Sequence, residues 1–132
     1  MLTKIWQHQT FRQFTKFCLV GLVNTLIDFL VYLFLSRIIG LPFWGANLIS
    51  VFIAMSSSFI FNKYWTFRNR DNNHKIQFIK FTLVNIVYFL LNNGIVFGLV
   101  HFAQIDDLAA KLVAVAVGMF WNFGANKLWT FR

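Results

Sequence analysis

Hydrophobic side chains dominate four long stretches of the chain, and polar or charged residues separate these stretches. They run roughly over 17–39, 43–61, 81–103 and 108–125. Each includes a run of about 20 residues with at most one charged side chain, which is the length that a helix needs to cross the hydrocarbon core of a bilayer. The pattern therefore predicts an all-α membrane protein with four transmembrane helices.

The composition agrees with a membrane protein and argues against an enzyme. The chain is 58% hydrophobic and 20% aromatic but only 12% charged, which is outside the usual proportions of a soluble domain. At 132 residues it is expected to form a single domain, 1–132. It has no nucleophile–base pair, no histidine or cysteine cluster with metal-ligand spacing and no phosphate-cradling glycine loop. We predict a protein that is not an enzyme and uses no cofactor or metal.

The positive charge has a one-sided distribution along the chain. A formal net charge of +8 would suggest nucleic-acid binding in a soluble protein. Here, ten of the twelve Lys and Arg residues precede the first stretch, lie between the second and third, or follow the fourth, whereas Arg37 and Lys111 lie on the other side, near the ends of the first and fourth stretches. The positive-inside rule then predicts cytoplasmic N and C termini. We expect contact with anionic membrane lipid and no nucleic-acid partner.

The two halves of the chain match at a fixed offset of 64 residues. FNKYWTFR at 61–68 returns as ANKLWTFR at 125–132, and further identities extend over 13–68 and 77–132 without a gap. Such a register predicts two helical-hairpin repeats. Because a two-span unit returns the chain to its starting side, the repeats have parallel orientation, unlike the inverted repeats of many secondary transporters.

Polar residues interrupt the first and third stretches near their middles. Asp28 lies in the first stretch, and its counterpart in the repeat is Asn92. A carboxylate at this depth costs at least about 2.5–3.5 kcal/mol, so Asp28 is predicted to be functional. Asn24 shares a helix face with Asp28 and is included with it. Asn85 and Asn93 are interpreted as hydrogen-bonding residues between helices.

Small or polar residues form a stripe along the second and fourth stretches. Small residues at four-residue spacing let helix backbones approach closely, so we expect these faces to pack. The stripe comprises Asn47, Ser50, Ala54 and Ser58, repeated as Lys111, Ala114, Gly118 and Asn122. Within it, Asn122 is the candidate for a ligand role.

The repeated Asn-Lys-x-Trp-Thr-Phe-Arg lies where a stretch meets the predicted cytoplasmic surface. Tryptophan often anchors a helix at that depth, and Lys or Arg there can extend to water, so anchoring is one interpretation. The other is a binding site, because a Lys and an Arg that bracket an indole offer two kinds of cation to a phosphate and a flat face to a sugar or lipid chain. The sequence leaves both open.

These motifs carry a family resemblance. F-x-x-V-G-L-x-N-T-x-x-D at 17–28, F-N-K-Y-W-T-F at 61–67 and W-N-F-x-x-N-K-L-W-T-F at 121–131 resemble the GtrA-like family of small four-span bacterial membrane proteins. The resemblance covers nearly the whole chain. It implies translocation (flipping) of a polyprenyl-phosphate-linked monosaccharide across the bacterial cytoplasmic (inner) membrane, where a glycosyltransferase on the other side uses it for cell-surface polysaccharide.

The residues and the resemblance together predict a substrate-binding path of polar side chains within the spans and basic motifs at the interface. Its members are Asn24, Asp28, Asn62, Lys63, Trp65, Arg68, Asn92, Asn122, Asn126, Lys127, Trp129 and Arg132. The expected partners are the polyprenyl-phosphate-linked sugar, membrane glycosyltransferases and a second copy of the chain in a homodimer, since four spans make a thin bundle.

Two other functions compete with translocation. A non-transporting membrane partner could recruit or stabilise a glycosyltransferase through its packing stripes and aromatic residues alone. A proton-coupled exporter of small cations could also use one acid in its first span, but the basic motifs would repel a cation at the cytoplasmic side.

Overall fold

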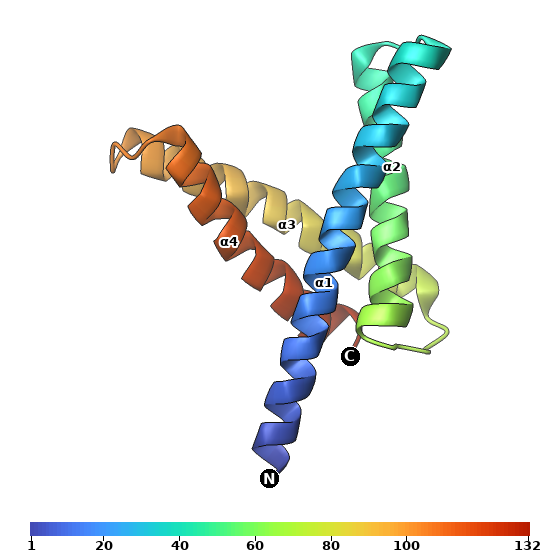
Figure 1. Cartoon of the computed structure of the whole chain (residues 1–132), viewed down its shortest axis with the longest axis vertical. Coiled ribbons are helices and arrows are strands. Elements are labelled where there is room, and N and C mark those ends of the chain that lie inside the picture. Colours follow the sequence, from blue (N-terminus) through green and yellow to red (C-terminus); the bar gives the residue numbers. More distant parts are fainter. The chain divides into compact units, whose positions relative to one another are not determined.

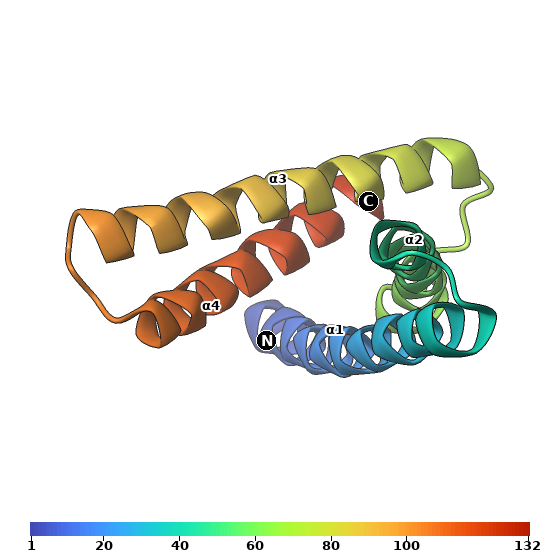
Figure 2. The same cartoon turned by 90° about the horizontal axis from the view of Figure 1, so that it is seen from above.

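The computed structural model describes all 132 residues, which divide into two compact units, Met1–Arg70 and Asp71–Arg132. Each unit is a hairpin of two long helices. In Figure 1 and Figure 2, α1 runs beside α2 within the first unit, and α3 runs beside α4 within the second. The single-domain organisation over 1–132 stays a prediction.

The first hairpin consists of α1 (Leu2–Leu33) and α2 (Phe43–Phe61), each followed by a short π-helical segment. These segments are η1 (Phe34–Ile39) and η2 (Asn62–Thr66). In the turn between the helices, Gly40 has a φ of +82°, a left-handed conformation that glycine adopts without a steric penalty. Gly40 thereby ends the first helix at the position where the chain must reverse.

The second hairpin has the same order of elements. It consists of α3 (His74–His101), α4 (Asp107–Ala125) and a π-helical segment, η3 (Asn126–Thr130). Asp107 lies in the first turn of α4, where a carboxylate is favoured by the helix dipole. The offset between η2 and η3 is 64 residues, which is the offset of the predicted repeat.

The four helices confirm the predicted all-α class. Each is long and apolar enough to cross a membrane, and large apolar side chains such as Leu22, Leu26 and Phe29 are exposed on the outside of the first hairpin. Two of the helices begin well before the apolar stretches that predicted their spans. The first helix begins at Leu2 and the third at His74, because hydropathy marks only the apolar part of a helix, and the polar segments before it contain no glycine or proline to stop it.

The stripes of small residues pack inside the hairpins. The buried positions are Ala46, Ser50, Ala54 and Ser58 on α2, and Ala110, Ala114 and Gly118 on α4. The prediction was wrong at Asn47 and Lys111, which are exposed. A stripe with four-residue spacing runs back from Ser50 to Ala46, so the neighbouring position turns away from the packed face.

Candidate functional site

Polar side chains of the repeated motif are buried where the first hairpin ends. Asn62, Lys63 and Thr66 of η2 are each at most 2% exposed. The Nδ2 of Asn62 donates to the Oγ of Ser58 at 3.2 Å, and the ammonium of Lys63 donates to the Oδ1 of Asn69 at 3.3 Å. The Oδ1 of Asn62 and the Oγ1 of Thr66 are buried without a hydrogen-bond partner in the protein. The motif therefore combines satisfied and unsatisfied buried polar groups.

Trp65 connects η2 to α1. The Nζ of Lys16 lies 5.2 Å from the centre of the Trp65 ring, within the range of a cation–π interaction. The same ammonium donates to the Trp65 carbonyl oxygen at 3.4 Å. Because the indole remains about half exposed, Trp65 has surface left for a ligand or for lipid.

The second hairpin places its copy of the motif in the same way. The Nζ of Lys80 lies 5.3 Å from the centre of the Trp129 ring, and Lys80 and Trp129 are the repeat counterparts of Lys16 and Trp65. Asn126 and Thr130 are buried, whereas Lys127 is half-buried with its Nζ 5.8 Å from the Phe123 ring centre. Both hairpins thus present an indole beside a lysine ammonium.

Amide groups cross-link the two helices of the second hairpin. Asn126 donates to the Oδ1 of Asn122 at 2.7 Å and to its backbone oxygen at 2.8 Å. Asn122 donates in turn to the Oδ1 of Asn85 on α3, at 3.4 Å. The interpretation of Asn85 as a residue that hydrogen-bonds between helices is confirmed, and the Asn122 amide, the candidate for a ligand role, takes part in the same network.

Asn24 and Asp28 lie one turn apart on α1, inside the apolar stretch. Both are half-buried, and the Oδ1 atom of each is buried without a hydrogen-bond partner in the protein. By contrast, Asn93 on α3 is exposed and donates to the backbone oxygen of Phe89 at 2.8 Å. The first hairpin therefore holds two acceptors without a hydrogen-bond partner inside the apolar stretch of α1, while Asn92 of the second hairpin is half-buried.

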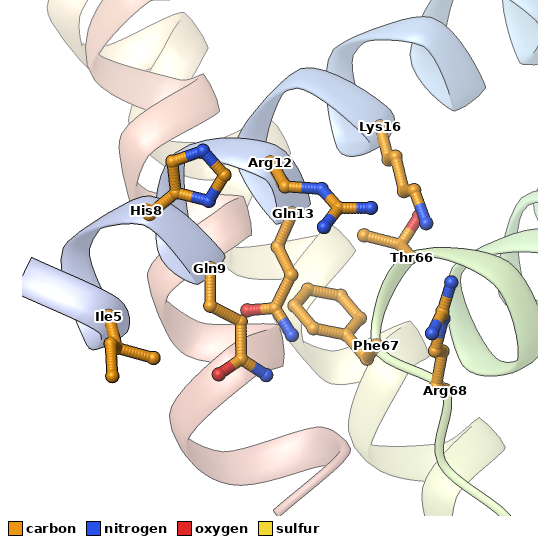
Figure 3. A pocket seen from close by; sticks show the side chains of 9 residues that line it. All are labelled: Ile5, His8, Gln9, Arg12, Gln13, Lys16, Thr66, Phe67 and Arg68. Atoms are coloured by element: carbon orange, nitrogen blue, oxygen red, sulfur yellow. The ribbon is translucent and has the colours of Figure 1, made fainter. Parts of the chain in front are cut away.

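A cavity of about 290 Å³ lies between the N-terminal part of α1 and the end of η2. Figure 3 shows Arg12 and Lys16 of α1 and Arg68, which follows η2, around the same space. The remaining lining residues are Ile5, His8, Gln9, Gln13, Thr66 and Phe67. None of the four acidic residues of the chain is among them, so the cavity has an unbalanced positive charge.

An apolar groove of about 470 Å³ lies further along the same hairpin. Its lining residues are Leu19, Val20 and Val23 of α1, Phe61 of α2 and Trp65 of η2. The Trp65 ring that lines this groove is the one beside Lys16, and Lys16 lines the cationic cavity. The two spaces are therefore neighbours along α1.

The structure brings together some of the predicted site residues and adds others. Arg68, predicted from the motif, lines a cavity with Arg12 and Lys16, which sequence reasoning used only to assign topology. Their four-residue spacing places both on one face of a helix, and this was the available signal. Lys63 is fully buried. Its assignment to substrate binding, like that of Lys127 and the other predicted members, stays a prediction.

Comparison with known proteins assigns the family. A family model described as "GtrA/DPMS, transmembrane domain" matches residues 16–131. The uncharacterized membrane protein YngA of Bacillus subtilis (strain 168) is 33% identical over 119 residues, which cover 88% of this chain and 77% of that protein. The segment matched by the family model includes the polar residues of the first span and both tryptophan motifs that carried the resemblance. The chain is a member of the GtrA/DPMS transmembrane-domain family.

Proposed function

We propose that this protein moves a polyprenyl-phosphate-linked monosaccharide across the bacterial cytoplasmic membrane for the glycosylation of cell-surface polysaccharide. Family membership supports a role with lipid-linked sugars. The observation that carries the more specific proposal is the pair of unused acceptors in the first span, the Oδ1 atoms of Asn24 and Asp28.

A sugar crosses a bilayer slowly because its hydroxyl groups lose their hydrogen bonds to water, and these acceptors can replace some of those bonds. A sugar presents several hydroxyl groups, and each loses hydrogen bonds to water when it enters hydrocarbon. Carboxylate and amide oxygens accept hydrogen bonds from hydroxyl donors. Asn24 and Asp28 would replace part of the lost hydration at the depth where it is missing, and Asn92 is proposed to do the same in the second hairpin.

The basic ends of the hairpins would supply the contact with the phosphate. Lys63, Arg68, Lys127 and Arg132 are proposed to attract it, with Trp65 and Trp129 packing against the sugar or the lipid chain. The asymmetry of the basic residues supports a cytoplasmic location for these ends and for both termini. A homodimer is proposed to complete the path.

Transport into liposomes tests the proposal. The protein is reconstituted with a fluorescent or radiolabelled polyprenyl-phosphate monosaccharide, and the appearance of the sugar on the opposite leaflet is followed. Asp28→Leu is expected to slow transport at least about tenfold, because a hydrogen bond to a charged group is worth about 1.5–3 kcal/mol, and Asn24→Leu by a smaller factor of about three to ten, because a hydrogen bond between neutral groups is worth about 0.5–1.5 kcal/mol. Leucine favours membrane insertion, so these variants should still fold in the bilayer.

The matched control is Asn93→Leu, which makes the same change at an exposed position of another span. It should transport at the rate of the unchanged protein. Asp28→Asn separates the acceptor from the charge, since the amide keeps an oxygen. Normal transport by both leucine variants would contradict the proposal. An unchanged protein that leaves the sugar in place but copurifies with a membrane glycosyltransferase would instead support the recruiting function.

A further inference from the structure

We infer that the first hairpin holds a composite site for a lipid phosphate, in which the cationic cavity binds the phosphate and the adjoining apolar groove binds the hydrocarbon chain. The inference deepens the proposed function and rests on it for the identity of the lipid. It assigns phosphate recognition to Arg12 and Lys16, from outside the repeated motif, together with Arg68.

Three cations converge on the cavity without an acid to balance them. Arg12 and Lys16 extend from one face of α1, and Arg68 follows η2, as Figure 3 shows. Guanidinium groups bind phosphate oxygens in pairs, and an ammonium adds a point charge. Because like charges repel when brought together, an anion between them would stabilise the arrangement.

Buried polar atoms at the cavity match a phosphate ester with a polar head. Thr66 is 2% exposed, and its hydroxyl has no hydrogen-bond partner in the protein, so it is available to donate to a phosphate oxygen. The Oε1 of Gln13 is also buried and unpartnered, and it can accept from a sugar hydroxyl. Arg68 has a φ of +49°, a left-handed conformation that is uncommon for arginine and that functional sites often retain.

The apolar groove gives the site its preference for a lipid. It begins about one helical turn beyond Lys16, at Leu19, and continues to Val23. Lys16 lines the cavity, and the Trp65 ring beside it lines the groove, so a phosphate held by Lys16 would have its ester chain pointing along the groove. A chain in this groove lies against the apolar part of α1, on the way into the bilayer.

The second hairpin lacks part of this site. Lys16 and Arg68 have basic counterparts in Lys80 and Arg132, but the position equivalent to Arg12 is Ile76. The matched family segment begins at residue 16, so Arg12 also lies outside it. The inference therefore predicts that phosphate binding depends on the first hairpin through a residue with no equivalent in the second.

Binding measurements on the full chain in nanodiscs of neutral phosphatidylcholine test the site. The probes are farnesyl phosphate, which has both parts, inorganic phosphate, which lacks the chain, and farnesol, which lacks the phosphate. Farnesyl phosphate is expected to bind tightest. Arg12→Gln and Arg68→Gln should each weaken its binding about tenfold, because each removes a charge-assisted contact. Val23→Phe, which fills the groove, should weaken binding of farnesyl phosphate and leave that of inorganic phosphate unchanged.

Two variants with the same loss of charge serve as controls. Arg70→Gln changes an exposed residue close to Arg68, and Lys80→Gln changes the counterpart of Lys16. Both should bind farnesyl phosphate like the unchanged protein. Equal binding by Arg12→Gln, Arg68→Gln and the unchanged protein would overturn the site, as would an equal loss in the controls, since that would indicate nonspecific attraction.

The binding measurements and the transport measurement can fail independently, so they test the lipid-phosphate site and the proposed function separately. Binding that depends on Arg12 and Arg68 in a protein that moves no lipid-linked sugar would support the site and contradict translocation. Normal transport by variants with lost binding would overturn the site's role in the cycle while leaving translocation in place. Circular dichroism of each variant in the same nanodiscs checks that the helices are intact.

Discussion

Replacing Asn126 with aspartate is expected to destabilise the second hairpin by about 3–5 kcal/mol, the range found when a buried charge loses its compensation. The Asn126 side chain is fully buried, and its Nδ2 donates to two oxygens of Asn122, at 2.7 and 2.8 Å. A carboxylate in its place would direct an oxygen at two acceptors, neither of which can donate. Rotation of the Asn122 amide would bring its Nδ2 to the carboxylate but remove it from Asn85.

The repeat supplies the control for this prediction. Asn62 is the counterpart of Asn126 and is also buried, but its Nδ2 donates to the hydroxyl of Ser58. A hydroxyl can rotate and donate to a carboxylate. Asn62→Asp should therefore be less destabilising than Asn126→Asp, by about 1–2 kcal/mol. Unfolding with SDS in mixed micelles, followed by circular dichroism, measures both variants. An equal or greater loss for Asn62→Asp would show that the Asn122 contacts do not determine the effect.

The fold was predictable because the bilayer imposes it through composition. Apolar stretches of about 20 residues leave a helix as the form that satisfies the backbone within one segment. The stretches at 43–61 and 108–125 agree with α2 and α4 to within a residue. The starts of α1 and α3 were missed, since a helix that continues into the polar region changes neither hydropathy nor topology. The segment of α1 before residue 17 nonetheless supplies most of the cationic cavity.

Residues of the candidate site were predictable only where they belong to a motif that occurs twice or where they place a polar side chain within an apolar stretch. Asp28 was found because a carboxylate in an apolar stretch is costly, and the tryptophan motifs because they occur twice. Arg12 and Arg68 are more than fifty residues apart in the sequence. They line the same cavity because α1 packs against η2. The positive-inside rule already explains basic residues near a membrane, so their positions in the sequence do not separate binding residues from the others.

The two hairpins use equivalent positions differently. In the second, Asn85 and Asn122 form a hydrogen bond between α3 and α4. The equivalent positions in the first are Gly21 and Ser58, and an added Cβ at Gly21 would have no atom within 4 Å. Such an open face next to Asn24 is compatible with a ligand, whereas the amide bridge closes the equivalent face. We therefore expect the first hairpin to contribute more to binding and the second to contribute more to stability.

A substitution at Gly118 tests the expected contribution of the second hairpin to stability. Gly118 is buried on α4, and a Cβ added to it would overlap the Tyr88 ring of α3, with the Cδ2 atom at 2.7 Å. Gly118→Ala is therefore expected to destabilise the second hairpin by about 1–3 kcal/mol, the usual cost of overpacking. Gly124→Ala on the same helix is the control, because its Cβ would meet no atom within 4 Å, and alanine stabilises a helix by about 0.5–1 kcal/mol relative to glycine.

The first hairpin indicates how the Gly118 variant can be rescued. In the first hairpin, Asn24 stands at the position equivalent to Tyr88, and Ala54 at the position equivalent to Gly118. Asn24 is smaller than Tyr88, and Ala54 is larger than Gly118. Adding Tyr88→Asn to Gly118→Ala reproduces that pair and removes the ring from the position of the new Cβ. The double variant should be more stable than the sum of the single changes predicts, by about 1–2 kcal/mol, as expected for residues in contact. SDS unfolding of the four proteins of this cycle measures the coupling, and additive effects would mean that the Tyr88 ring does not limit the residue at 118.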